Sequence, residues 1–145
     1  MHIQELGHVV LYVSDLTRMA DFYRDTLGFT EITRTHGVAV FGGGRTHHEL
    51  LLIEIGTPPQ PRAITPGLYH IGFKIGDTTE VLKKAYQELR ALGVAIVGTG
   101  DHTVTHSLYI LDPDGNELEL YVDVDSSWKD DPHAILAPTK PLRLE

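Results

Sequence analysis

The alternation of apolar and polar positions repeats one order of elements twice along the chain. In the first half, an apolar and β-branched run over residues 6–13 predicts a strand. Ser14 and Asp15 supply N-cap chemistry for a helix whose apolar residues recur at helical spacing, and Gly28 is its predicted C-cap. Three short strands are then predicted, over residues 29–33, 38–41 and 49–55.

The same order begins again after a proline-rich segment. The prolines within residues 57–66 exclude a helix or a central strand there, so residues 57–67 are predicted to be a linker. A strand over residues 68–75 is followed by a capping-box pattern at residues 77–80 and by a helix. Three more strands are predicted, over residues 94–97, 107–111 and 117–122.

This repeat predicts the architecture. The two modules, residues 6–56 and 68–124, would each bury one sheet face, which predicts a single compact domain over residues 1–124 with a cleft between its halves. Residues 125–145 form a C-terminal tail.

The composition narrows the classes of function. The chain has 145 residues, 41% hydrophobic and 22% charged, which suits one globular domain. Its formal net charge is −8 and no basic face is apparent, so we expect no nucleic-acid partner. No apolar run is long enough to span a membrane, and no signal peptide is visible. The absence of cysteine excludes disulfides and thiolate chemistry and favours a reducing cytoplasm.

Two histidines and one glutamate are candidate metal ligands. His8 and His70 occupy matching positions, because each lies seven residues before the aspartate that starts the next helix. Glu119 alternates with leucines on a strand, and a buried carboxylate is costly unless it is paired or binds a metal. Each residue alone is as well explained by a core histidine or a solvated glutamate. Together they match the facial triad that leaves metal positions open, as in non-haem iron(II) oxygenases.

Further candidates surround these ligands. If the turn over residues 112–116 pairs 111 with 117, Tyr109 lies opposite Glu119 on the same sheet face. His48, at the entrance of the last strand of the first module, is a candidate acid–base group. His102 and His106 lie in a segment that we expect to be a loop over the site, where each alone is more typical of a surface histidine.

At these residues the chain resembles the vicinal oxygen chelate superfamily. The resemblance rests on three segments, Gly7-His8-Val9, residues 21–29, and the turn over 112–116 followed by Glu119-Leu120. It covers nearly everything from residue 6 to residue 124. The fold that it implies is a pair of βαβββ modules whose strands form an eight-stranded, cup-shaped mixed sheet around one metal.

Within that superfamily the chain is most similar to the type I extradiol catechol dioxygenases. The resemblance assigns His8, His70 and Glu119 to the metal, His48 to acid–base catalysis, Tyr109 to the substrate oxygen and His102 to its support. It implies Fe(II), with Mn, Ni, Zn and Co as alternatives, and a small aromatic diol and O₂ as substrates. Most such enzymes carry four modules and this chain carries two, so we expect a homodimer that shelters the cleft.

Three other functions stay open. A glyoxalase- or epimerase-like enzyme would need a fourth protein ligand, for which Glu49 is the candidate. A fosfomycin-type resistance transferase shares the metal triad, but no basic cluster precedes Tyr109. A ligand-sequestering protein of the bleomycin-binding type needs no triad, so the presence of one argues against it.

Overall fold

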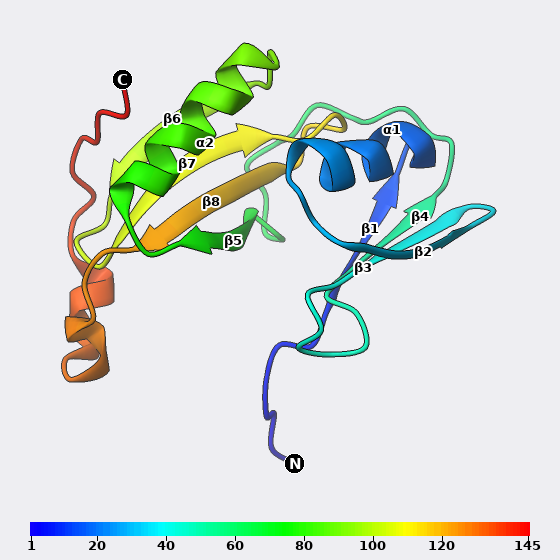
Figure 1. The fold of residues 1–145 in the computed structure, drawn as a ribbon. Helices are drawn as coiled ribbons and strands as arrows, with labels where there is room; N and C mark the ends of the chain where they lie inside the picture. The colour runs from blue at the N-terminus through cyan, green and yellow to red at the C-terminus, as the bar shows by residue number, and fades with distance from the viewer. The chain divides into compact units, whose positions relative to one another are not determined.

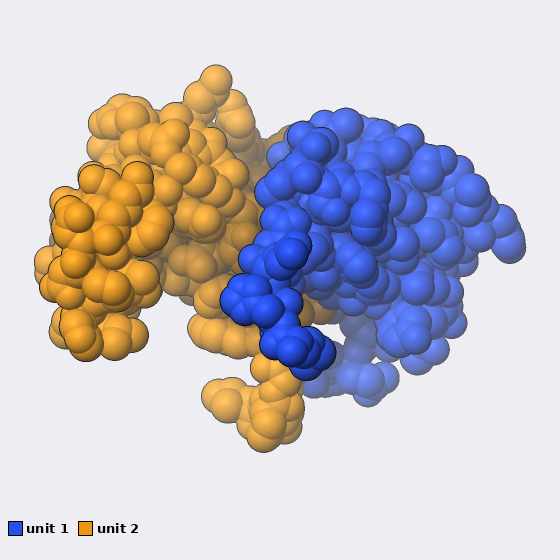
Figure 2. Space-filling model, turned by 90° about the horizontal axis from the view of Figure 1, so that it is seen from below, with its two compact units in different colours: residues 1–62, 113–115 blue, residues 63–112, 116–145 orange.

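A computed structural model describes all 145 residues of the chain. It contains eight strands, two α-helices and three short turns of π- or 3-10 helix, which confirms the predicted α+β class (Figure 1). The chain divides into two compact units, shown in different colours in Figure 2. One unit comprises residues 1–62 and 113–115, and the other comprises residues 63–112 and 116–145.

The first unit holds a four-stranded mixed sheet with the strand order β1-β4-β3-β2. In this sheet β1 and β4 are parallel, and the other neighbours are antiparallel. One face is buried beneath the helix, where Met19, Tyr23, Phe41 and Leu52 are completely inaccessible to solvent. The elements of this unit are β1 (Val9–Val13), α1 (Leu16–Asp21), a π-helical turn (Phe22–Thr26), β2 (Glu31–Thr35), β3 (Val38–Phe41) and β4 (Leu50–Glu54).

The sequence explains the limits of the first helix. The Asp15 side chain caps α1 by accepting a hydrogen bond from the Arg18 amide at 2.8 Å, as predicted. The helix then widens into the π-turn, where the Leu27 amide donates to the Phe22 carbonyl at 3.1 Å. Gly28 follows with φ +71°, the left-handed conformation that ends helices and favours glycine.

The second unit repeats this topology with the strand order β5-β8-β7-β6. Here β5 and β8 are the parallel pair. The tail packs on the same unit, because Lys140 exchanges two backbone hydrogen bonds with Asp101 at 2.8 and 3.0 Å and Leu144 is only 2% exposed. The elements are β5 (His70–Gly76), α2 (Thr79–Ala91), β6 (Ile96–Asp101), β7 (Thr105–Leu111), β8 (Glu117–Asp123) and two 3-10 turns (Ser127–Lys129 and Pro132–Leu136).

Two local predictions in the second unit were wrong. The capping box does not form: the helix begins after Thr78, and no side chain caps it. The Asp77 carboxylate, expected to be the cap, forms an ion pair with Lys74 at 2.5 Å. The segment with His102 and His106, which we expected to be a loop, is mostly a β-hairpin whose turn contains Thr103 at φ 72°. A side chain at position 100 would press on the His102 ring, since a Cβ there would lie 3.0 Å from its Nε2.

The repeat extends to the strand register. Val9 is paired with Leu50 in the first sheet, and Ile71 is paired with Leu118 in the second. Counted from His8 and His70, these are the same positions, and the two modules stay in the same register up to Tyr12 and Lys74, after which a bulge shifts the second pair.

No helix of the structure is both long and apolar enough to cross a membrane.

Candidate functional site

The last hairpin of the second unit sets the geometry of the site. In its turn, the Asp112 carboxylate accepts hydrogen bonds from the Asn116 amide at 2.8 Å and from the Asn116 side chain at 2.9 Å. The five-residue turn thereby pairs Leu111 with Glu117, and Tyr109 is the direct cross-strand partner of Glu119. The predicted register is confirmed.

Glu119 is held by three side chains. Its Oε1 accepts hydrogen bonds from the Ser107 hydroxyl at 2.6 Å and from the Tyr109 hydroxyl at 3.1 Å. Its Oε2 lies 3.1 Å from Nε2 of His70. Ser107 is completely buried and was missed in the sequence, although the two-residue period of the strand places it on the same face as Tyr109. The carboxylate is therefore oriented by fixed donors.

A second set of hydrogen bonds runs from the tyrosine to the tail. His102 Nε2 lies 2.8 Å from the Tyr109 hydroxyl, and His102 Nδ1 lies 3.1 Å from the Thr139 hydroxyl. Because the Tyr109 proton is donated to Glu119, its oxygen accepts from Nε2, which leaves Nδ1 of a neutral ring to accept from Thr139. Burial, together with the negative charge of Glu119, raises the pKa of Tyr109 to about 12, so the phenol stays protonated at neutral pH.

Four of these side chains, those of His70, His102, Tyr109 and Glu119, line a pocket of about 510 Å³ within the second unit. The tail contributes Trp128 and Ile135 to its wall. No lysine or arginine lines the pocket, and its one aspartate, Asp123, is paired with Lys74 at 2.7 Å. The lining residues are His70, His102, Val104, Thr105, Tyr109, Glu119, Tyr121, Asp123, Trp128 and Ile135. The chemistry of this wall suits a small, uncharged, partly apolar molecule.

His70 and Glu119 form a donor pair that fits a divalent metal. Metal bonds of about 2.0–2.2 Å from imidazole nitrogen and carboxylate oxygen put neighbouring ligand atoms about 3 Å apart, as observed for His70 Nε2 and Glu119 Oε2. Gly72 pairs with Glu119, and a Cβ at position 72 would be in van der Waals contact with Oε2 at 3.5 Å. His70 Nδ1 is buried without a hydrogen-bond partner. The closest polar contact of the ring is made through Nε2, the nitrogen that faces Glu119.

In the first unit, His8 and His48 lie together with His47, which sequence reasoning did not select. One ligand nitrogen from each of the three rings lies within 4.8 Å of the others. Desolvation lowers the pKa of His48, and the neighbouring His8 and His47 lower it further, so its ring is neutral and able to accept a proton at neutral pH.

Two residues whose roles the sequence left open have structural partners. The Glu49 carboxylate binds the Gly43 amide and the Arg45 side chain, which occupies the group considered as a fourth metal ligand. His106 donates or accepts at the Thr79 hydroxyl at 2.9 Å, at the start of α2. His106 is three residues before Tyr109 on β7, so its side chain lies on the opposite sheet face and does not line the pocket.

Comparison with known proteins gives a family match over most of the chain. The model of the Glyoxalase/Bleomycin resistance protein/Dioxygenase superfamily matches residues 5–120. A catechol-2,3-dioxygenase of Bacillus subtilis is 34% identical over 128 residues, which are 87% of this chain and 44% of that protein. Glutathione transferase FosA of Serratia marcescens is 33% identical over 122 residues, which are 83% of this chain and 82% of that protein.

A solved structure supports the fold. The crystal structure of a glyoxalase/dioxygenase from Nostoc punctiforme matches with a TM-score of 0.71 and 22% identity, over 84% of this chain and 92% of that one. At this identity the match shows the architecture alone. The chain spans between 37% and 63% of the length of the Bacillus subtilis dioxygenase and three further relatives.

Proposed function

The chain belongs to the glyoxalase/bleomycin resistance protein/dioxygenase superfamily, and from this we propose that it is a metal-dependent extradiol dioxygenase that opens a catechol-like ring. The observation that carries the proposal is the set of contacts that joins Glu119, Tyr109 and His102 beside His70 in a pocket without cations. The similarity to a catechol-2,3-dioxygenase over 87% of this chain supports the same choice.

We assign the metal to His8, His70 and Glu119. The last two offer donor atoms 3.1 Å apart in the second unit, and His8 is assigned from its matching position in the repeat. Fe(II) is our choice, and Mn, Ni, Zn and Co suit the same donors. When bound, the metal supplies Lewis-acid activation of two vicinal substrate oxygens and an open position for O₂.

The chain's own residues then bind and deprotonate the diol. His48, neutral because its pKa is lowered, takes a proton from a substrate hydroxyl. The Tyr109 hydroxyl stays protonated and, by turning from Glu119, donates its one hydrogen bond to a substrate oxygen, while His102 donates to the Tyr109 oxygen and holds its orientation. Val104, Trp128 and Ile135 supply apolar surface that keeps water from the ring.

Anaerobic reconstitution with Fe(II), followed by catechol and air, tests the proposal. We expect a yellow ring-fission product from the wild-type chain. His70→Ala should lose both iron and colour, whereas His48→Ala should keep iron and lose turnover. His36→Ala, at an exposed histidine of the first unit, is the matched control and should behave as wild type. Stoichiometric iron without colour across a panel of catechols would contradict ring cleavage.

A second candidate is a metal-dependent transferase. One observation favours it: the chain covers 82% of the Serratia marcescens glutathione transferase, against 44% of the dioxygenase. The pocket argues against a transferase, because glutathione carries carboxylates and no lysine or arginine lines the pocket wall to bind them. Loss of free thiol from glutathione in the presence of Mn(II) and an epoxide, without any yellow product, would favour the transferase.

A further inference from the structure

The first unit contains a cluster of three imidazoles, His8, His47 and His48. The ring centroids of His8 and His48 lie 4.3 Å apart, those of His47 and His48 lie 4.4 Å apart, and those of His8 and His47 lie 5.8 Å apart. Nδ1 of His47 is 2.5 Å from Nδ1 of His48. We propose that these three histidines form a second metal site, selective for a divalent ion that prefers nitrogen ligands, such as Zn(II) or Cu(II).

The geometry of the rings fits one ion. With metal–nitrogen bonds of about 2.0–2.1 Å, the nitrogens around a single ion lie about 3 to 4 Å apart. The ligand atoms of the three rings already lie within 4.8 Å of one another, so small side-chain rotations complete the set. At most one proton fits between the two close Nδ1 atoms, so at least one of these nitrogens is unprotonated and has a lone pair that an ion can take in place of the hydrogen bond.

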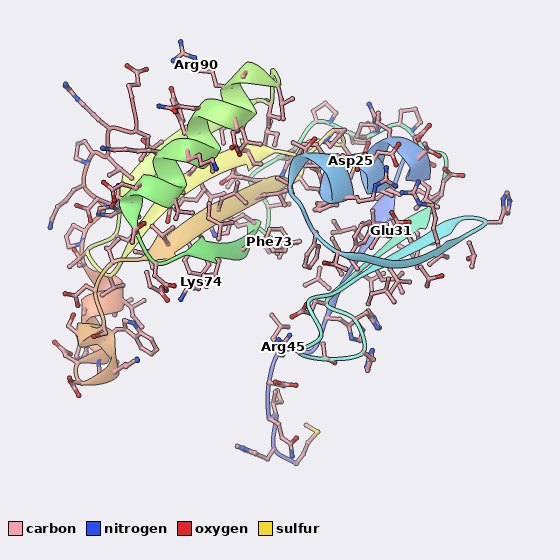
Figure 3. All side chains as sticks on the ribbon, in the orientation of Figure 1. Asp25, Glu31, Arg45, Phe73, Lys74 and Arg90 are labelled. Carbon is pink, nitrogen blue, oxygen red and sulfur yellow. The ribbon has the colours of Figure 1, made fainter.

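Arg45 holds the two segments that carry the rings. Its guanidinium donates to the carbonyls of Leu6 and Gly7 at 3.1 and 3.2 Å, directly before His8. It also binds Glu49 at 3.1 Å, directly after His48. Figure 3 shows Arg45 where the loop after β3 passes the N-terminal segment. The Arg45 side chain therefore holds together the two segments that carry the rings. Because these segments are already fixed, less entropy is lost when the rings bind an ion.

The ligand chemistry decides which ions bind. The nearby carboxylates of Glu5 and Glu49 are both bound to Arg45, so the site offers imidazole nitrogens alone. Imidazole suits Zn, Cu and Ni, and divalent affinities rise toward Cu(II), whereas the carboxylate of Glu119 makes the proposed catalytic site more suitable for Fe(II) and Mn(II). The two donor sets therefore differ in the metal that they favour.

The site has a regulatory consequence that rests on the proposed function. His8 and His48 belong to both the cluster and the proposed dioxygenase machinery, and one imidazole nitrogen cannot serve two ions. An ion held by the three histidines would therefore withdraw His8 and His48 from ring cleavage. On this basis Zn(II) and Cu(II) act as inhibitors through His47, a residue with no part in the proposed reaction.

Metal titration of the full-length chain tests the site without reference to activity. The double variant His70→Ala with Glu119→Gln removes the ligands of the second unit and keeps the cluster. We expect this variant to bind one equivalent of Zn(II) by calorimetry and to give a Cu(II) electron paramagnetic resonance spectrum with nitrogen couplings. Adding His47→Ala should weaken Zn(II) binding at least about 10- to 100-fold. Losses of this size follow even when only a residue that hydrogen-bonds a metal ligand is removed, and a ligand itself should contribute more.

The controls separate the site from general histidine binding. His36→Ala in the same double variant removes an exposed histidine of the first unit and should leave binding unchanged. His47→Gln serves as a second variant if His47→Ala alters the circular dichroism spectrum. Absence of Zn(II) binding in the double variant, or equal binding with and without His47, would overturn the proposal.

An inhibition assay then tests the regulatory consequence. Micromolar Zn(II) should inhibit the iron-loaded wild-type enzyme and have little effect on His47→Ala. Equal inhibition of the two would show that the ion acts elsewhere. If the protein has no dioxygenase activity, the proposed function fails while the calorimetry still decides the metal site.

Discussion

The two modules share a backbone plan and differ in what their open faces carry. Each has a mixed sheet in which the strand with the histidine runs parallel to the last strand of the module. Two residues beyond His70, Gly72 pairs with Glu119, and two residues beyond His8, Val10 pairs with Leu51. A leucine thus stands in the first module where the second has its carboxylate.

Glu31 in the first module and Glu119 in the second have different kinds of partner. In the first, Arg34 binds Glu31 at 2.7 Å and Arg24 binds Asp25 at 2.7 Å, around the labelled side chains of Asp25 and Glu31 in Figure 3. Arg34 and Glu31 both lie on β2, and Arg24 reaches Glu31 from the π-helical turn at 3.2 Å, so the Glu31 charge is neutralised by two arginines. In the second, Glu119 has hydroxyl and imidazole partners and no cation. The alternation of buried residues therefore determines the fold, while single residue differences on the other sheet face determine which chemical groups it presents.

The largest effect should come from the shared core. Leu52 and Leu120 occupy equivalent positions and are 0% and 4% exposed. Truncation of either to alanine should lower the free energy of unfolding by about 2–5 kcal/mol, measured by urea denaturation. Leu92→Ala, at a 66% exposed position, is the control and should change it little. If one core variant were nearly neutral, the two modules would not have equivalent cores.

The next largest effect concerns the hydrogen bonds of Glu119, the carboxylate that the first module lacks. Tyr109→Phe removes a hydroxyl that joins Glu119 to His102, and loss of a hydrogen bond to a charged group costs about 1.5–3 kcal/mol. We expect kcat for ring cleavage to fall about 10- to 100-fold with iron content unchanged. Because the pKa of Tyr109 is about 12, its ionisation should not affect the wild-type rate at lower pH.

Tyr86→Phe is the matched control for this variant. Tyr86 lies on α2, where its hydroxyl contacts Glu145 at 3.4 Å, and its substitution should leave kcat unchanged. An unchanged kcat in Tyr109→Phe would show that the hydroxyl does not act on the reaction.

The smallest effect tests the ion pairs of the first module. The hydrogen bond from Arg34 lowers the pKa of Glu31 from its usual 4.5, so the folded state favours the ionised carboxylate. The stabilisation is present above pH 4.5 and is lost as the pH falls below that value. Glu31→Gln should therefore cost about 1 kcal/mol at pH 7, and the difference from wild type should shrink toward pH 3.

Thermal unfolding at both pH values measures this difference. Glu88→Gln is the control, since Glu88 makes only a 3.8 Å pair with Lys84 on the exposed side of α2. A wild-type advantage that stayed constant with pH would contradict the assigned role of the Glu31 charge.

Much of the fold and part of the site followed from local sequence patterns. The repeat, the helix start at Asp15 and the pairing of Tyr109 with Glu119 were predictable, because strand period, capping and turn length act over a few residues. β1 begins at Val9 and not at residue 6, since its start depends on pairing with β4. The contacts of Ser107, His47 and Thr139 depend on tertiary packing, which no local pattern specifies.

The C-terminal tail also covers part of an exposed strand edge. β6 is an edge strand, and an edge strand exposes backbone donors and acceptors with which a neighbouring chain can pair. Lys140 occupies these groups at Asp101, and the Leu142 carbonyl accepts from the Thr99 hydroxyl at 2.8 Å. The segment that contains Thr139 therefore pairs with the edge strand at Asp101, where a neighbouring chain could otherwise add a strand.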